Sequence, residues 1–194
     1  MTALQKSTLP GLGSNAEKGL TQTPRMNVVD AAMNDLLSQY DSAAEVIASG
    51  VARLSREQLL WRPPTGAPTS AGTWSIQEVV IHLQDADVEF ADRFKRIIAS
   101  DTSVLQAWNE NDFAKNLFYA EQSTDDAVEV IRLTHRQMMR IFRRPPDAAF
   151  TRTGTHSERG VQTLTDVLKY ATWHVEHHVS FIHEKRKLMD TLSA

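Results

Sequence analysis

The sequence predicts an all-α protein, a four-helix bundle with long connections after the second and the third helix. In four long stretches the apolar residues recur every three or four positions, which is the helical period, and the alternation typical of strands is hard to find. The 194 residues include only 8 Gly and 7 Pro, and all of these except Gly50 fall outside the four stretches. Hydrophobic residues make up 41% of the chain, enough for a core between the helices.

The first half of the chain contains two of the long helices. The first is expected over residues 28–54, with residues 38–42 as the place where it would break and Gly50 as a weak point. Ser55 and Gln58 have the spacing of a capping box, which predicts a short helical turn over residues 56–61. Residues 62–73 are rich in Pro, Gly and Thr and form a loop. Ser75 with Glu78 then predicts the start of the second helix, which runs to about residue 100.

The second half begins with a less regular segment. Residues 101–122 are expected to be irregular or briefly helical, with Trp108 as a packing anchor. Ser123 caps the third helix, which must stop at the prolines 145–146 because proline interrupts helical hydrogen bonding. Residues 147–162 are a polar connection, and the fourth helix covers residues 163–187. Residues 1–26 read as a flexible or loosely docked extension, so the bundle comprises residues 27–194.

Composition narrows the classes of function. The formal net charge is -3 and no basic cluster is interleaved with aromatic residues, so nucleic acid is not expected as a partner. No apolar run has the roughly 18 residues of a membrane span, and the N-terminus lacks the apolar core of a signal peptide. The chain has no cysteine, which agrees with a cytoplasmic location and means that any thiol chemistry needs a thiol from outside. We therefore expect a cytoplasmic protein without a membrane partner.

The fourth helix carries four histidines that are not equivalent. At about 100° per residue, His178 falls near the middle of the apolar stripe and His174 on its flank, whereas His177 and His183 project away from it. His174 and His178 thus face inward one turn apart, a spacing that suits two ligands of one metal ion. Such a pair alone is more often incidental, but its place on an apolar face, where a core alone would favour Leu or Ala, gives a metal site equal weight with an incidental pair.

His82 on the second helix is the candidate third ligand. It lies at the edge of that helix's apolar stripe, and side chains on facing helices build the metal sites of bundles. Three histidines would leave a coordination position open for water or substrate, as in catalytic zinc sites. Taken alone, a histidine at the edge of an apolar stripe is more often a hydrogen-bonded residue of the core or its rim.

Four further polar residues are candidates for supporting roles. Asp87 could orient a ligand histidine, or it could form a buried salt bridge with an arginine of a neighbouring helix. His135, on the inner face of the third helix, could be a ligand or a proton carrier, but a hydrogen-bonded core histidine is the preferred interpretation. His156 and Glu158 precede the fourth helix and could reach the mouth of a pocket in the bundle, or lie in a solvated loop.

Three segments resemble a known family. They are Trp-Ser-Ile-Gln-Glu-Val-Val-Ile-His at residues 74–82, His-Ser-Glu-Arg-Gly at residues 156–160 and Trp-His-Val-Glu-His-His-Val-Ser-Phe-Ile at residues 173–182. In their order and spacing they resemble the DinB-like superfamily of metal-binding four-helix bundles, and within it the metal-dependent hydrolases of the bacillithiol transferase (YfiT) type. The resemblance covers roughly residues 36–187. Ser157 stands where the family often has Pro, and Asp87 where Glu is frequent.

The resemblance implies a metal site and a choice of reactions. Carried over by position, the ligands are His82, His174 and His178, and the ion is usually nickel or zinc. The first reading is a transferase that joins a small thiol of the bacillithiol, mycothiol or glutathione type to an electrophilic substrate, with Asp87, His156 and Glu158 as candidate catalytic residues. The alternatives are a hydrolase that uses metal-bound hydroxide and a metal-binding stress protein without turnover. A homodimer agrees with the family's habit.

Overall fold

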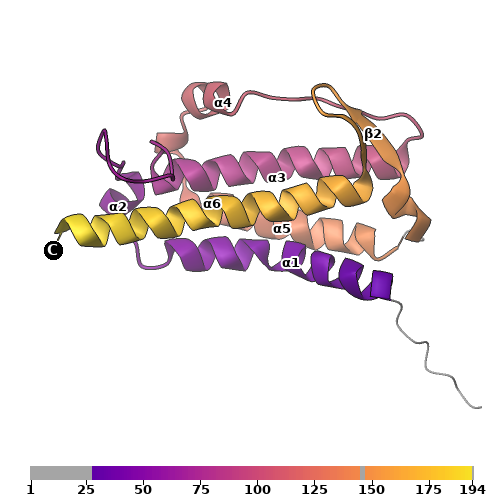
Figure 1. Cartoon of the computed structure of the whole chain (residues 1–194), viewed down its shortest axis with the longest axis horizontal. Helices are drawn as coiled ribbons and strands as arrows, with labels where there is room; N and C mark the ends of the chain where they lie inside the picture. The colour runs from indigo at the N-terminus through magenta and orange to yellow at the C-terminus, as the bar shows by residue number, and fades with distance from the viewer. Residues whose placement is uncertain (1–27, 145–146, 194) are drawn as a thin grey trace, which may run out of the picture.

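Four long helices form the body of the molecule. The computed structural model describes residues 28–144 and 147–193 (Figure 1). The long helices are α1 (Val28–Val51), α3 (Ile76–Ala99), α5 (Thr124–Phe142) and α6 (Leu164–Ser193). Helices α1 and α3 each pack against both α5 and α6, and α3 contacts α6 along the bundle. The predicted four-helix bundle is confirmed, and the expectation for residues 1–26 concerns a segment outside the described residues.

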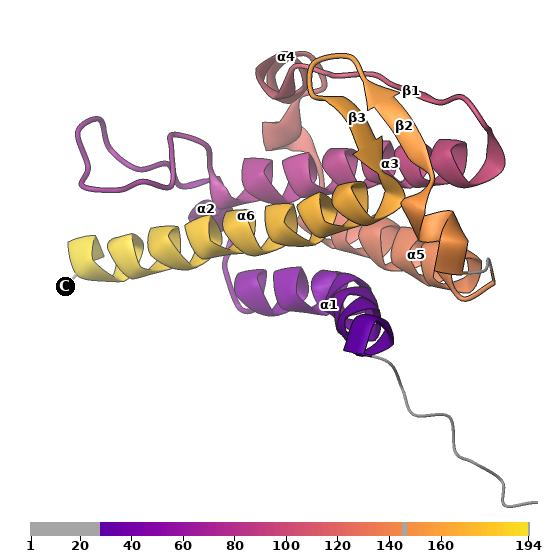
Figure 2. The ribbon, with the colours of Figure 1, turned by 45° about the vertical axis from the view of Figure 1, so that its right-hand side comes forward.

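The helices are not connected in simple up-and-down order. Figures 1 and 2 show α1 and α6 running in one direction, and α3 and α5 in the other. The chain between the parallel helices α3 and α5 must therefore return along the whole bundle. It does so through β1 (Val104–Leu105), α4 (Glu110–Asn116) and the 3-10 turn η1 (Tyr119–Glu121). This long return brings residues 104–116 across one side of α3 and α6 (Figure 2).

Local signals in the sequence determine most helix ends. Ser75 and Glu78 form both hydrogen bonds of a capping box at the start of α3, and Ser55 and Gln58 do the same for α2 (Arg56–Leu60). Ser123 caps α5 as predicted. Helix α1 is continuous, so the break near residues 38–42 is not found; it ends at Val51, and Arg53 adopts a left-handed conformation with φ of 64°. Helix α6 runs six residues beyond its predicted end at 187.

A small sheet, which the sequence did not predict, lies at one end of the bundle. The polar connection before α6 forms the 3-10 turn η2 (Asp147–Thr151) and the antiparallel strands β2 (Thr153–His156) and β3 (Gly160–Thr163). Strand β1 pairs with β2 in parallel, Val104 opposite Thr155 and Leu105 opposite His156. Strands of two to four residues are too short for alternation to stand out in a sequence. The pairing links the connection after α3 to the connection before α6.

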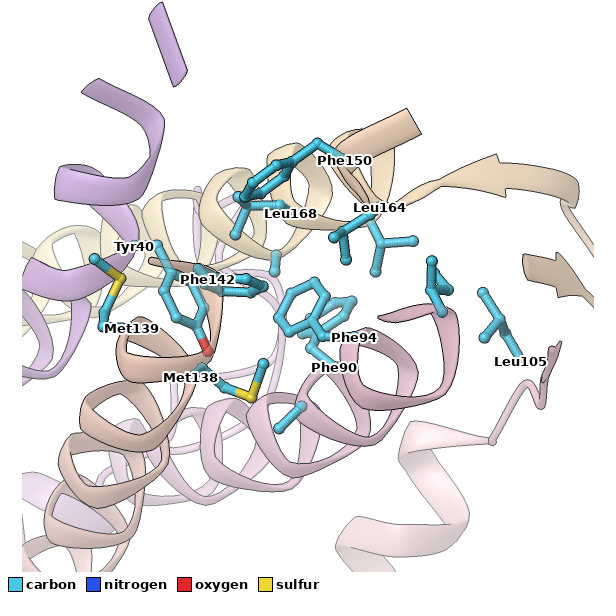
Figure 3. Close-up of a cluster of buried hydrophobic side chains, with 14 of the residues drawn as sticks. Tyr40, Phe90, Phe94, Leu105, Met138, Met139, Phe142, Phe150, Leu164 and Leu168 are labelled. Atoms are coloured by element: carbon cyan, nitrogen blue, oxygen red, sulfur yellow. The ribbon is translucent and has the colours of Figure 1, made fainter. Parts of the chain in front are cut away.

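Aromatic and sulfur-containing side chains fill the bundle next to the sheet. Figure 3 shows Phe90 and Phe94 of α3 meeting Phe142 of α5 and Leu164 and Leu168 of α6. A second apolar cluster, which includes Ile47, Ile76 and Ile182, fills the opposite end. Burial of this apolar surface is the main force that holds the helices together. No described helix is long and apolar enough to cross a membrane.

Two side chains of α6 form hydrogen bonds with the loop before α3. Lys185 is fully buried, and its ammonium group donates hydrogen bonds to the carbonyl oxygens of Ala71 at 2.7 Å and Gly72 at 2.9 Å. The carboxylate of Glu184 accepts hydrogen bonds from Thr69 Oγ1 at 2.6 Å and from the backbone N–H of Ser70 at 2.8 Å. Two neighbouring residues of α6 therefore fix this loop, which leads to Trp74 at the start of α3.

Candidate metal centre

Three histidines from two helices meet inside the bundle. His82 comes from α3, and His174 and His178 come from successive turns of α6. One ring nitrogen of each histidine lies within 4.8 Å of the corresponding atoms of the other two. The Nε2 atoms of His82 and His174 are 3.1 Å apart. Two imidazole nitrogens that each bind one ion at about 2.0–2.1 Å are separated by roughly this distance. The structure thus brings together the three residues that the sequence suggested.

Burial keeps these histidines in the neutral form. The exposed fraction is 1% for His82 and 8% for His174, and His178 is half-buried. Desolvation is the main cause that lowers the pKa to about 3 for His82, to about 2 for His174 and to about 4 for His178, and repulsion between the neighbouring rings adds to it. A neutral imidazole has a free lone pair, which is the form that binds a metal ion. The donor set therefore fits a divalent ion.

Aromatic packing, rather than a hydrogen bond to Nδ1, orients the three rings. The Nδ1 atoms of the three histidines are buried and have no hydrogen-bond partner in the described residues. His82 lies between Trp74 and Trp108, with ring centroids 5.2 Å and 5.6 Å away. Many metal sites instead fix the second ring nitrogen with a carboxylate or a carbonyl. Packing of the rings is therefore the restraint on their orientation here.

The triad lies between two cavities. One, of about 100 Å³, is lined by His82 and His174 together with side chains of α3, the β2–β3 hairpin and α6. The other, of about 240 Å³, is lined by His178 and Phe181 of α6 and by residues 71–74. Glu110 of α4 lines both cavities, and its Oε2 is 3.9 Å from His82 Nε2. Groups in the first cavity would approach His82 and His174, and groups in the second would approach His178, so the two cavities meet the triad from different sides.

Of the two roles considered for Asp87, contact with a ligand histidine is not found in the described part of the chain. Asp87 is 5% exposed, and its Oδ1 lies 2.6 Å from Nε2 of His135. Nδ1 of His135 donates to the carbonyl oxygen of Tyr40 at 2.6 Å, and the tyrosine ring stacks on the imidazole. Asp87 is therefore half of a buried pair, with a histidine instead of the arginine considered above. The interpretation of His135 as a hydrogen-bonded core residue is confirmed.

His156 and Glu158 lie at the first cavity, as their position before α6 suggested. His156 is the last residue of β2 and is buried, and Glu158 is exposed in the β2–β3 turn. The Nδ1 atom of His156 accepts hydrogen bonds from the backbone N–H groups of Glu158 and Arg159. Burial lowers the pKa of His156, and the charges of Arg93 and Arg159 lower it further. His156 is therefore neutral and carries its proton on Nε2; the catalytic roles of both residues remain predictions.

Several residues of this site were not singled out from the sequence. Glu110, Arg93, Arg159 and Tyr170 all line the first cavity. Arg93 follows His82 by 11 residues, close to three helical turns, so both lie on the same face of α3. An arginine on the buried face of a helix was the available signal. The sequence contained no comparable signal for Glu110, because the fold of residues 101–122 brings it to the triad.

Comparisons with known proteins agree with this architecture. The family model of the DinB superfamily matches residues 39–182. The protein named "Putative metal-dependent hydrolase YfiT" from Bacillus subtilis is 22% identical over 153 residues, which are 78% of this chain and 86% of that protein. A protein of Oceanobacillus iheyensis with the same hydrolase description is 21% identical over 155 residues, 80% of this chain and 86% of its own length.

A solved structure shows the same fold. The structure of YfiT from Bacillus subtilis, described as a four-helix bundle of unusual topology, superimposes with a TM-score of 0.76 at 20% sequence identity. The match covers 86% of this chain and 93% of that one. Because the family model spans well over half of the chain, the protein described here belongs to the DinB superfamily.

Proposed function

We propose that this protein is a metal-dependent transferase that joins a low-molecular-weight thiol to an electrophilic substrate. The observation that carries this proposal is the position of the triad between two cavities, one lined by His82 and His174 and the other by His178. A transfer reaction needs room for two organic molecules, whereas hydrolysis needs room for one and a water. The chain has no cysteine, so the thiol would have to arrive as a cosubstrate.

His82, His174 and His178 would hold the ion, and imidazole donors suit zinc and nickel among other metals. When bound, a divalent ion supplies Lewis acidity that lowers the pKa of a neighbouring thiol. Glu110 is our candidate acceptor for the thiol proton, because its carboxylate is 3.9 Å from His82 Nε2. The C–S bond forms as the leaving group departs from the electrophilic carbon with its electron pair.

Hydrolysis is the second candidate function. The carboxylate of Glu110 beside His82 could also take a proton from water, and the relatives compared above carry the hydrolase description. A metal-binding stress protein without turnover is favoured less, because a protein that only holds a metal needs no cavity beside it.

The metal site is tested first, by the metal content of protein purified without an affinity tag. His174→Ala is expected to lose the bound metal because one of three ligands is removed, and His183→Ala, which changes an exposed histidine of the same helix, is expected to keep it. Equal metal content in wild type and His174→Ala would rule out the site.

The reaction is tested next, with a generic electrophile such as chlorodinitrobenzene or monochlorobimane. The substrate is supplied with bacillithiol, with mycothiol, with glutathione or without a thiol. Turnover that requires one thiol supports transfer, turnover without a thiol supports hydrolysis, and a metal-loaded protein that turns over nothing argues for the stress protein.

A further inference from the structure

Among the described residues, neither arginine of the first cavity forms an ion pair with a carboxylate. Arg93 of α3 is 6% exposed; one of its amino groups donates to the carbonyl oxygen of Gln106 at 2.8 Å, and its buried Nε has no hydrogen-bond partner in the described residues. Arg159, in the β2–β3 turn, donates to the hydroxyl of Tyr170 at 2.9 Å. Its guanidinium lies over the ring of Tyr170, 4.1 Å from the centroid. Both arginines line the same cavity as His82 and His174.

A buried guanidinium without a counter-ion is costly, so its retention needs a reason. Structural arginines in protein interiors are normally paired with a carboxylate. Two acidic residues do line this cavity, but neither forms an ion pair with either arginine: Glu110 lies at the His82 end, and Glu158 is exposed at the rim. Burial is the main cause that lowers the pKa of Arg93; the nearby charge of Glu89 raises it, and repulsion by Arg159 lowers it again. An anionic ligand group between them would relieve this repulsion.

We infer that Arg93 and Arg159 form a carboxylate-binding subsite, and that the thiol cosubstrate is one that carries a carboxylate. The guanidinium group is planar, and its parallel N–H donors match the two oxygens of a carboxylate. Because the subsite and the triad share one cavity, a molecule held by its carboxylate would have its sulfur within reach of His82 and His174. This inference rests on the proposed function, because it identifies the carboxylate-bearing molecule as the thiol cosubstrate of the transfer.

The rest of such a molecule has space beside the subsite. The cavity itself is small, about 100 Å³, but a recess of about 610 Å³ shares Ala107, Trp108, Glu110 and Glu158 with it. The electrophile would then use the cavity on the other side of the triad, whose wall contains the apolar side chains of Trp74, Val79 and Phe181. The charged cavity is therefore assigned to the thiol and the apolar one to the second substrate.

The test compares two thiols that differ in one group. N-acetylcysteine carries a carboxylate, and N-acetylcysteamine is the same molecule without it. Their dissociation constants are measured by calorimetry on the protein purified with its metal, so no turnover is needed and a failure of the transferase proposal leaves the result interpretable. Wild type is expected to bind N-acetylcysteine about 10-fold or more tightly than N-acetylcysteamine, the effect of hydrogen bonds to a charged group.

The variants connect this preference to the two arginines. Arg159→Gln changes an exposed turn residue and is expected to reduce the preference by about 10-fold, because one charged donor group is lost. Arg93→Lys keeps the charge without the Nε donor and is expected to reduce it partly. The matched control Arg136→Gln, on the exposed face of α5, is expected to retain the wild-type preference.

Three results would overturn the inference. They are equal affinity of wild type for the two thiols, no measurable binding of either thiol, and an unchanged preference in both Arg159→Gln and Arg93→Lys. Thermal unfolding of each variant confirms that it is folded, so that a lost preference reports on the subsite.

Discussion

Acid is expected to unfold the metal-free protein through its buried histidines. In the folded state the pKa values are about 3 for His82, about 2 for His174 and about 4 for His178. In the unfolded chain each returns to the ordinary histidine value of about 6.5. Below pH 6.5 the unfolded chain therefore binds protons that the folded protein excludes. The stability from neutral burial is complete above pH 6.5 and is lost progressively as the pH falls toward the folded values.

The size of this loss in stability follows from the difference between the folded and the unfolded pKa values. Each pKa unit corresponds to about 1.4 kcal/mol, so one histidine that stays neutral contributes a loss of about 2 kcal/mol between pH 6.5 and pH 5. Three such residues give at most about 6 kcal/mol. His178 is half-buried, and water that enters the site reduces the effect, so we expect about 4 kcal/mol. This is a large share of the roughly 5–15 kcal/mol that stabilises an ordinary domain.

Urea unfolding at pH 7, 6 and 5 measures this loss after the metal is removed with a chelator. His174→Gln, which removes the histidine with the lowest pKa, is expected to reduce the loss by roughly one third. His156 is also buried with a lowered pKa and contributes in the same direction, which is why the comparison with a single variant is needed. His183→Gln, at an exposed position, is the control. The reasoning would be refuted by a stability loss smaller than about 1 kcal/mol between pH 7 and pH 5. It would also be refuted if His174→Gln lost as much stability as wild type.

Three further predictions concern packing and polar contacts away from the triad. Asp87→Leu leaves Nε2 of buried His135 without a partner and is expected to lower the free energy of unfolding by roughly 3–5 kcal/mol. Asp87→Asn, whose amide can still bond to His135, should lose less stability. Equal losses in the two variants would contradict this. Lys185→Met leaves two carbonyl oxygens unpaired and is expected to lower the free energy of unfolding by roughly 1–3 kcal/mol. Residues 62–73 should then be cleaved faster by proteases. The exposed control Lys187→Met should change neither the stability nor the rate of cleavage. Gly154→Ala would place a Cβ 3.0 Å from Leu105 and 3.1 Å from Ile97, which predicts a loss of roughly 1–3 kcal/mol in urea unfolding; a stability equal to wild type would show that the sheet can shift away from α3.

The parts of the structure that the sequence predicted are those with local causes. The capping boxes at Ser55 and Ser75 depend on residues three positions apart, so they can be recognised without knowledge of the fold. The inward positions of His174 and His178 follow from the helical period, because one face of α6 is apolar. His82 needed a further assumption, that α3 and α6 face each other, and the bundle meets it.

The parts that the sequence did not predict depend on contacts between distant segments. The partner of Asp87 is His135, 48 residues away, and only the packing of α3 on α5 decides between it and a ligand histidine. Strand β1 has two residues and is defined only by its pairing with β2, about 50 residues later. Glu110 reaches the triad because the chain between α3 and α5 returns along the bundle (Figure 1).

The parallel pairing of β1 with β2 has a consequence for redesign. Trp108 and Glu110 follow β1, and His156 and Arg159 lie at the end of β2 and in the turn after it, so the two walls of the first cavity are parts of one hydrogen-bonded unit. The backbone N–H of Ala107 also donates to the hydroxyl of Ser157, which joins the walls a second time. Grafting the specificity of a relative onto this bundle therefore means exchanging residues 103–110 and 153–163 as a pair. A chimaera that takes one segment alone would have two edges whose side chains and hydrogen bonds no longer match.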